Sequence, residues 1–313
     1  MGLPGISFDK GGKKEVAGKK ISAVTTSSIM GHYGNGMFPL TLLPAYRRFC
    51  RVAKECEVTN FPKSSTADRR AGNFILKKPW TWKYVRKIGD RGMLNSYGLS
   101  NDGAPANAPK IDRAIRQGYK VIPNLYPQFA KGLLTAVDEI MSAIRTLRSE
   151  LLLDFWALEL NYSCANSKEA ISKNMEDANF CTNEIHGQYP NLILIVKISY
   201  VHPYEFAQEQ IKLGASVIHA INAIHHDIVY PGQTSPLSQV GGGAVSCKPI
   251  FPYSHSYNKG LRKKIKAPII MAGGISRLKD AQRFFDIGAD AISFCSIIRL
   301  DPKEAEKIIL KFN

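Results

Sequence analysis

A helix that ends at glycine and turns quickly into an apolar strand recurs along the chain, and this repeat restricts the fold more than any other feature. It appears as IRQGYKVIPNL (115–125), IKLGASVIHAIN (211–222) and FFDIGADAISFCS (284–296). Glycine just past a helix end supplies the left-handed backbone that ends the helix, and a β-branched run follows. Helices and strands that alternate in this way indicate parallel strands joined by crossover helices.

Eight apolar runs have the length and composition of strands of such a sheet. They cover 21–26, 57–61, 120–126, 155–161, 192–199, 216–222, 268–274 and 291–296, with helical stretches such as 43–55 and 132–150 between neighbours. No GxGxxG follows any of them, which disfavours an open dinucleotide-binding sheet. We therefore predict an α/β fold, a (β/α)8 TIM barrel, forming a single domain over residues 1–313.

Two stretches lie outside the alternation. Residues 62–115 hold no convincing helix and are rich in Arg, Gly, Asn and Pro, and residues 223–258 are similarly loop-like. Loops longer than about 12–15 residues in a compact domain are usually functional or disordered. Insertions that follow barrel strands lie over the C-terminal mouth, where catalysis occurs. We expect both stretches to cover that mouth.

Composition excludes several classes of protein. No run of about 18 apolar residues is present, so no membrane span is expected, and the N-terminus lacks the apolar region of a signal peptide. The six cysteines form no CxxC pair, so neither a disulfide framework nor a metal site is indicated. A reducing, cytoplasmic setting without bound metal is the simplest interpretation.

The formal net charge of +16 is the compositional outlier, with lysines clustered over 10–20 and basic residues over 259–266. Such charge is compatible with nucleic acid or another anionic partner. A solvated basic surface is the alternative, and we favour it because no nucleic-acid recognition motif accompanies the clusters.

Polar residues follow most of the predicted strands, and parallel strands would bring them to one mouth of the barrel. They are Lys63, Ser64, Ser65 and Thr66 after the second strand, Asn161 to Asn166 after the fourth, Lys197 in the fifth, Asn222 after the sixth, Gly273 and Gly274 after the seventh, and Cys295 and Ser296 after the eighth. This convergence predicts a site at the C-terminal end of the barrel.

Lys197 and Cys164 are the most informative of these residues. Lys197 directly follows LILIV and would lie inside the barrel. A buried lysine without an anionic partner is costly, so a bound anion or an electron-rich ring is expected beside it. A cysteine is more often a small buried hydrophobe than a reactive group. Around Cys164, however, Asn161, Ser163 and Asn166 make a polar pocket that an apolar core would not tolerate.

The pair Gly273-Gly274 precedes a predicted helix, SRLKDAQRFFDIG. Backbone amides and the positive end of a helix favour phosphate. Ser296, from the next strand, could add a hydroxyl group. Strands seven and eight carry the usual phosphate site of barrels, so we expect a phosphate group here.

Taken together, these segments resemble the dihydroorotate dehydrogenase family, specifically its class 1 members, which use a cysteine base. ELNYSCANS (159–167) looks like the Asn-x-Ser-Cys-Pro-Asn active-site loop of that family. KSSTADRRAGN (63–73) and MLNSYGLSNDG (93–103) are similar to two further family segments, and VKIS, AIN, AGGI and the last-strand serine complete the set. The resemblance covers roughly residues 20–300 in the same order.

The resemblance implies FMN as cofactor and a small-molecule dihydropyrimidine as substrate. Cys164 would take the C5 proton while C6 gives a hydride to flavin N5, and Lys197 would face the N1/O2 edge of the flavin. Substrate contacts would come from Lys63, Asn95, Gly98, Leu99, Asn161, Asn166 and Asn222. Cofactor contacts would come from Lys63, Ser64, Asn161, Lys197, Gly242, Gly243, Gly273, Gly274, Cys295 and Ser296.

Four departures from the family pattern bear on specificity. Thr26-Ser27-Ser28 replaces the first-strand Ala-Ser-Gly, so flavin contacts from that turn are not expected. Ala165 replaces the proline of the catalytic loop, and Tyr97 stands where methionine is common. Ala223 replaces a Ser or Thr, which removes a hydrogen bond worth about 1 kcal/mol.

These departures keep alternatives open. The same chemistry on another dihydropyrimidine, such as dihydrouracil, is the nearest one, and an RNA-acting flavin barrel of the dihydrouridine synthase type is another. The RNA-acting type would need a C-terminal helical domain, so nucleic acid is not the favoured partner. The electron acceptor is fumarate, or NAD through a flavin and iron–sulfur partner subunit. Related enzymes commonly pair, so a homodimer is also implied.

Overall fold

The computed structural model describes residues 5–8, 18–75, 77–163 and 171–313. Among these residues, no helix is both long enough and apolar enough to cross a membrane.

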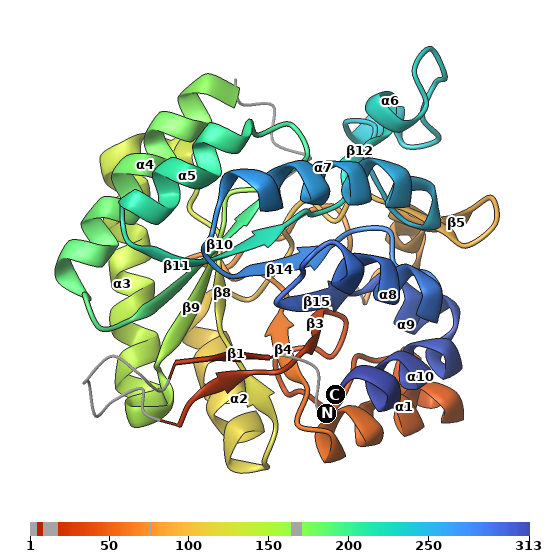
Figure 1. The fold of residues 1–313 in the computed structure, drawn as a ribbon, viewed down its shortest axis with the longest axis horizontal. Helices are drawn as coiled ribbons and strands as arrows, with labels where there is room; N and C mark the ends of the chain where they lie inside the picture. Colours follow the sequence, from red (N-terminus) through yellow and green to blue (C-terminus); the bar gives the residue numbers. More distant parts are fainter. Residues whose placement is uncertain (1–4, 9–17, 76, 164–170) are drawn as a thin grey trace.

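A curled parallel sheet occupies the centre of the molecule (Figure 1). Its strands, in spatial order, are β7 (Lys120–Val121), β4 (Thr59–Pro62), β3 (Val24–Ser28), β15 (Ala291–Phe294), β14 (Ile269–Ala272), β11 (Ala215–Ala220), β10 (Ile193–Ile198), β9 (Ala157–Asn161) and β8 (Asn124–Leu125). Every pairing between neighbours is parallel.

The sheet closes because β7 and β8 are two halves of one strand, separated by Ile122 and Pro123. The first half pairs with β4 and the second with β9. Two further bonds join β8 to the chain after β4: the Ser65 amide donates to the Asn124 carbonyl at 2.9 Å, and the Tyr126 amide donates to the Ser65 carbonyl at 2.9 Å. The predicted barrel of eight strands is therefore confirmed.

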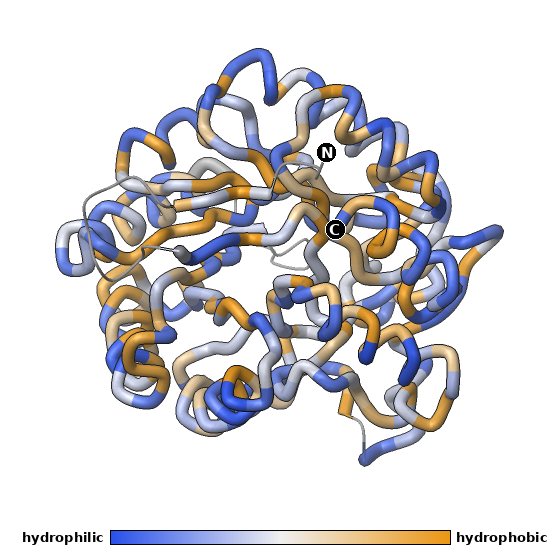
Figure 2. The backbone as a smooth tube through the Cα atoms, turned by 60° about the horizontal axis from the view of Figure 1, so that its bottom comes forward, coloured by the Kyte–Doolittle hydropathy of each residue, from blue (hydrophilic) through white to orange (hydrophobic). Residues whose placement is uncertain are grey.

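Helices follow the barrel strands and lie outside them (Figure 1). They are α1 (Pro44–Glu55), α2 (Ala104–Arg116), α3 (Leu133–Leu151), α4 (Ile171–Gln188), α5 (Tyr204–Lys212), α7 (Phe251–Lys264), α8 (Leu278–Asp286), α9 (Ser296–Leu300) and α10 (Pro302–Phe312). Short 3-10 turns lie at Leu40–Leu42, Pro79–Tyr84, Phe129–Lys131, Leu152–Asp154, Ser238–Val240 and Lys248–Ile250. The helices alternate between hydrophobic and hydrophilic residues along the chain, as helices with one buried face do (Figure 2).

The apolar core has two parts. The larger part lies between the strands and the surrounding helices, and the smaller one fills the interior of the barrel. The interior cluster consists of Ile6, Ile21, Phe61, Ile122, Ala157, Ile195, Val217, Ile270 and Ala291, all buried. Toward the carboxyl ends of the strands, inward positions become polar, which prepares the site described below.

The N-terminal end of the barrel differs from the prediction. Residues 21–26 were expected to form the first barrel strand, but β2 (Lys20–Ile21) pairs antiparallel with β1 (Ile6–Ser7), and the barrel strand begins at Val24. Ile6 and Ile21 belong to the interior cluster, so this hairpin covers the amino-terminal end of the barrel.

The two stretches expected to be loops contain regular structure, which corrects the sequence analysis. Residues 62–115 include β5 (Val85–Ile88), β6 (Gly92–Asn95) and most of α2, and residues 223–258 include β12 (Ile224–His225), α6 (His226–Val229), β13 (Ala244–Cys247) and half of α7. The four strands form one antiparallel sheet in the order β12, β13, β6, β5. β5 and β12 lie on the same side of the molecule (Figure 1).

Candidate active site

A cavity of about 1300 Å³, including space open to solvent, lies at the carboxyl ends of the barrel strands. Its walls come from β3, β9, β10, β14 and β15 and from residues that follow the barrel strands, including those after β4 and β11. Strands β6 and β13 of the antiparallel sheet cover one side. The sheet formed by the two insertions therefore covers the mouth, as expected for barrel insertions.

The cavity brings together most of the residues singled out from the sequence. They are Lys63, Ser64, Asn95, Gly98, Leu99, Asn161, Lys197, Asn222, Gly273, Gly274, Cys295 and Ser296. Cys164 and Asn166 lie outside the described residues. Gly242 and Gly243 do not line the cavity: Gly242 packs beside His225, and Gly243 packs against the backbone of Asn95.

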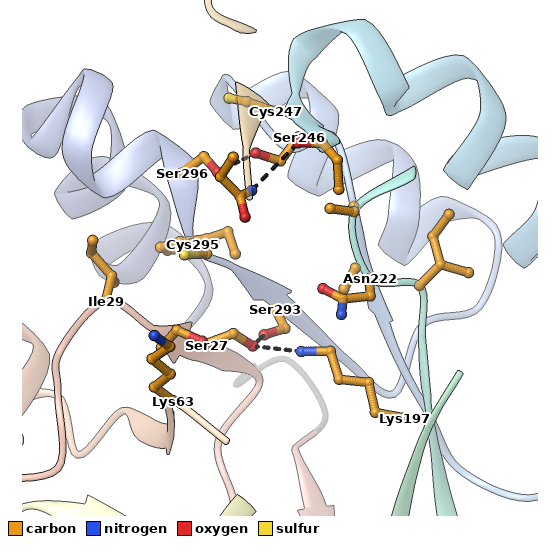
Figure 3. Close-up of a pocket in the computed structure, with 18 of the residues that line it drawn as sticks. Ser27, Ile29, Lys63, Lys197, Asn222, Ser246, Cys247, Ser293, Cys295 and Ser296 are labelled. Carbon is orange, nitrogen blue, oxygen red and sulfur yellow. Dashed lines mark hydrogen bonds between the residues drawn. The ribbon is translucent and has the colours of Figure 1, made fainter. Parts of the chain in front are cut away.

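Lys197 projects into the barrel from β10, where it is in register with Asn161 of β9. Its side chain is only 6% exposed, and its Nζ lies 3.5 Å from Ser27 Oγ. Ser27 in turn shares a hydrogen bond of 2.9 Å with Ser293, and Figure 3 shows the three side chains meeting at the base of the cavity. On the side of the cavity this ammonium group has only neutral hydroxyls near it, so it can bind an anionic or electron-rich ligand there.

Lys63 approaches the cavity from the side opposite Lys197 (Figure 3). Its Nζ donates to the Ser100 carbonyl at 2.6 Å and lies 4.2 Å above the centre of the Tyr97 ring. Burial lowers the pKa of Lys63 to about 8, because desolvation disfavours the charged amine. The cavity thus has two cations with different surroundings.

A chain of hydrogen bonds fixes the end of β9. Asn161 donates from Nδ2 to Ser64 Oγ at 2.8 Å and accepts from Ser163 Oγ at 2.6 Å. Asn222, at the end of β11, donates from Nδ2 to the same Ser163 Oγ at 2.9 Å. Ser163, the residue before Cys164 in the sequence, is thus held by two asparagines that line the cavity.

The opposite end of the cavity contains hydroxyls and glycine backbone. Ser246 of β13 and Ser296 share a hydrogen bond of 2.7 Å between their Oγ atoms (Figure 3). Gly273 and Gly274 have φ values of +95° and +88°, which non-glycine residues rarely adopt. A Cβ on Gly274 would also collide with the backbone of Phe251. This small-residue wall can admit a bulky polar group such as phosphate.

The backbone amides at the amino end of α8 are bonded to carboxylates of the protein itself. Asp280 Oδ2 accepts from the amides of Ser276 and Arg277 at 3.0 and 3.1 Å, and Glu304 Oε1 accepts from the Leu278 amide at 2.9 Å. The protein's own carboxylates therefore satisfy these donors. The contribution of this region to the cavity is limited to the backbone of Gly273 and Gly274 and the residues next to them.

Sequence reasoning missed several cavity residues. Ser27 was discounted as a departure from the family pattern, and Ser293 and Ser246 were not considered, yet all three line the cavity. Ser27 and Ser293 lie on β3 and β15, which pair in register, so alternation along these two strands could have indicated their inward position. Ser246 had no comparable signal, because β13 was expected to be loop.

The donor set fits a flavin nucleotide. A buried cation can face the ring edge that becomes negative on reduction, amide side chains can pair with imide-like groups, and hydroxyls with glycine backbone can hold phosphate. Among the described residues, no group of three or more His, Cys, Asp or Glu side chains is arranged to hold a metal ion.

Comparison with known proteins agrees with this chemistry. A family model described as dihydroorotate dehydrogenase matches residues 54–313, well over half of the chain. A Parabacteroides distasonis protein named dihydroorotate dehydrogenase B (NAD(+)), catalytic subunit, is 28% identical over 255 residues, covering 80% of this chain and 78% of its own length.

A protein of the same name from Caldicellulosiruptor saccharolyticus is 29% identical over 227 residues, covering 68% of this chain and 69% of its own length. A third, from Archaeoglobus fulgidus, is 26% identical over 214 residues, covering 66% and 67%. The matched region holds Lys63, Asn161, Lys197 and the glycine wall. The chain therefore belongs to the dihydroorotate dehydrogenase family, the flavin-dependent oxidoreductases that oxidise dihydroorotate to orotate in pyrimidine biosynthesis.

Proposed function

We propose that this chain, as a single domain over residues 1–313, oxidises dihydroorotate with FMN as the bound flavin and Cys164 as the base. The observation that carries the proposal is the pairing of two cations, partly buried Lys63 and buried Lys197, on opposite sides of one cavity. Ser163, which precedes Cys164, is hydrogen-bonded to two asparagines that line this cavity. One cation suits an anionic substrate and the other suits the flavin ring.

FMN, when bound, supplies the acceptor for the hydride that leaves C6 of dihydroorotate. Lys197 would lie at the N1/O2 edge of the ring, where a fixed positive charge favours the reduced form. Ser246, Ser296, Gly273 and Gly274 would surround the phosphate end, with Ser64, Asn161 and Cys295 between the two ends. Gly242 and Gly243, which directly precede β13, would contribute to flavin binding indirectly by positioning that strand.

The substrate would lie between Lys63 and the amide side chains. Lys63 provides the positive charge for the carboxylate of dihydroorotate, and Asn95, Asn161, Asn166 and Asn222 provide donors and acceptors for the ring amides. Gly98 and Leu99 would add backbone groups. Asn161 and Asn222 both hold Ser163, so the side chains that bind the ring would also position the base that follows it.

Cys164 would hold the C5 proton once it is transferred. A free thiol titrates near pH 8.5, so a moderately alkaline optimum is expected unless the bound ligands stabilise the thiolate. Asn166 would complete the polar surroundings of the thiol.

Electrons would leave through a partner subunit to NAD, in the cytoplasm, with the catalytic chain as a homodimer. The relatives are named as NAD-dependent catalytic subunits, which implies a separate electron-transfer subunit. The rival is direct reoxidation by fumarate.

The purified chain loaded with FMN tests the proposal. Dihydroorotate should bleach the flavin absorbance within one turnover, whereas dihydrouracil at the same concentration should not. This result is expected even though Ala223, which lacks the hydroxyl group common in the family at that position, lines the cavity. No bleaching with dihydroorotate would refute the proposed activity. Added fumarate should leave the bleached flavin reduced, and fast recolouring by fumarate would refute the need for a partner subunit.

A further inference from the structure

A buried acid–base cluster lies directly beneath the cavity, inside the barrel. Glu159 of β9 and His219 of β11 are both 0% exposed, and the His219 Nδ1 to Glu159 Oε1 distance is 2.5 Å. Asn124 of β8 donates to the other oxygen of the same carboxylate. None of these three residues lines the cavity, so contact with a ligand does not explain them.

The strand register places this cluster next to Lys197. Lys197 pairs with His219 on one side and with Asn161 on the other. Glu159 precedes Asn161 by two residues, so its side chain projects from the same face of β9, one layer lower in the barrel. Glu159, Lys197 and His219 thus occupy three adjacent strands and face one another across the barrel interior.

The pKa shifts of Glu159 and His219 favour one distribution of charge in this interior. The Lys197 ammonium and the His219 hydrogen bond lower the pKa of Glu159 against the opposing effect of burial. Burial and the Lys197 charge lower the pKa of His219. The cluster therefore consists of a carboxylate and a neutral imidazole that donates from Nδ1, and the carboxylate is the one anion that faces Lys197 among the described residues.

The other groups around Lys197 do not supply a counterion. Ser27 and Ser293 are neutral hydroxyls, and Cys295, directly after β15, is a thiol whose pKa burial raises to about 11. Lys63 carries the same sign of charge. Leaving a buried charge uncompensated is strongly unfavourable, so Glu159 is the residue that can act as counterion for Lys197.

We propose that Glu159 is a positioning residue that keeps Lys197 positively charged beneath the flavin, and that His219 and Asn124 hold Glu159 for this purpose. The part that concerns the flavin rests on the proposed function. Glu159 would thereby set how many protons accompany reduction: with Lys197 already charged, only the flavin takes up a proton. Without the carboxylate, Lys197 would become neutral at a lower pH than in the native protein, and above that pH it would take up a proton when the flavin is reduced.

The first test measures Lys197 itself, without flavin. Competitive acetylation with acetic anhydride, followed by peptide mass spectrometry, reports the pH at which the amine becomes neutral and reactive. In Glu159→Gln this profile should move to lower pH by about 1–3 units, the usual effect of one opposite charge nearby. Glu159→Asp, which keeps the carboxylate, should restore most of the native profile. An unchanged profile in Glu159→Gln would overturn the proposal.

A control variant separates this effect from general loss of a buried polar group. Gln210 is 0% exposed and accepts from Thr182 at 2.6 Å, outside the barrel. Gln210→Met should leave the Lys197 profile unchanged, and a shift as large as that of Glu159→Gln would overturn the assignment to Glu159.

The second test uses the FMN-loaded protein and measures the midpoint potential against pH. At pH values where the acetylation profile shows Lys197 to be neutral in oxidised Glu159→Gln, the slope for this variant should be steeper than for the native protein by one proton per two electrons. Equal slopes would overturn the link to the flavin. If the native chain binds no FMN, the proposed function fails, and the acetylation result still decides whether Glu159 controls Lys197.

A measurement on the native protein does not depend on how the variants fold. Long-range 15N–1H spectra of the histidines should show His219 protonated at Nδ1 and not titrating between about pH 5 and 8, unlike a free imidazole with a pKa near 6.5. Titration of His219 near pH 6.5 would overturn the cluster as described.

Discussion

The two halves of the barrel interior are built on the same strands but have opposite chemistry. Toward the amino ends, Phe61, Ile122, Ile195 and Ile270 fill the interior with apolar side chains. Lys197, two residues after Ile195 on β10, is a buried charged residue at the next inward position. A strand repeats its inward position every second residue, so one strand can provide both a core residue and a functional residue.

Stability and function in this barrel are therefore separated by height along the strands rather than by strand. Apart from the cluster of Glu159, Asn124 and His219, the lower half buries apolar area, which is the main favourable term in folding. The upper half buries charges and hydroxyls, which cost free energy unless they are paired or bound to a ligand. Substitutions in the lower half should therefore mainly reduce stability, and substitutions in the upper half should mainly reduce ligand binding or activity.

Replacing Phe61 by alanine should destabilise the fold by about 3–5 kcal/mol, because it leaves a cavity in the apolar layer. Phe61 is 0% exposed and packs against the His219 ring, with 5.4 Å between the ring centres. Chemical denaturation followed by circular dichroism measures the change. A loss below about 1 kcal/mol would contradict the view that the lower half carries the stability.

Replacing Cys164 by serine should slow flavin reduction by roughly 100-fold or more, since a positioned base contributes about 10²–10⁴-fold. FMN should remain bound and the free energy of unfolding should hardly change. Stopped-flow absorbance after mixing with dihydroorotate gives the rate. Native kinetics in this variant would show that the base lies elsewhere.

Raising the pH should weaken binding of orotate to the FMN-loaded protein. Lys63 has a pKa of about 8, so it is charged below that pH and neutral above it. An anionic ligand favours the charged amine, and affinity should fall by up to about tenfold per pH unit above pH 8. Isothermal titration calorimetry from pH 7 to 9.5 measures this. Lys63→Met should give weak binding with little pH dependence. A native profile as flat as that of this variant would show that Lys63 is not the group that binds the orotate carboxylate.

Replacing Ser246 by alanine should have the smallest effect, a loss of FMN affinity of about fivefold, equivalent to one hydrogen bond of about 1 kcal/mol. Ser246 shares its hydrogen bond with Ser296. Fluorescence titration of the flavin-free protein with FMN and with riboflavin gives the comparison. If the two serines bind the phosphate end of FMN, the affinity for riboflavin should not change. An equal loss of affinity for both ligands would show that the serines do not contact the phosphate.

The insertions show why part of the fold escaped sequence analysis. The α2 sequence APANAPKIDRAIR contains Pro105 and Pro109, which suggested loop. Pro105 lies in the first turn, where no amide bond is lost, and Pro109 removes only one. The buried residues Ala108, Ile111 and Ala114 then hold the helix against the rest of the core. Tertiary packing thus overrides a weak local propensity.

The antiparallel sheet escaped for a different reason. β6 pairs with β13, some 150 residues later in the chain, over only four residue pairs. Strands this short have little pattern of their own, and their stability comes from cross-strand contacts that the local sequence does not specify. Ser246 therefore could not be assigned to the cavity in advance.

The sequence by itself determined the barrel, because glycine-ended helices and β-branched runs act through local sterics and through burial that repeats along the chain. It also determined which polar residues end each strand, and hence that Lys63, Asn161, Lys197 and Asn222 would meet. Only the tertiary structure decided that Glu159 and His219 face Lys197 and that Asp280 satisfies the amides before α8. These depend on contacts between segments far apart in the chain, whose geometry exists only once the barrel closes.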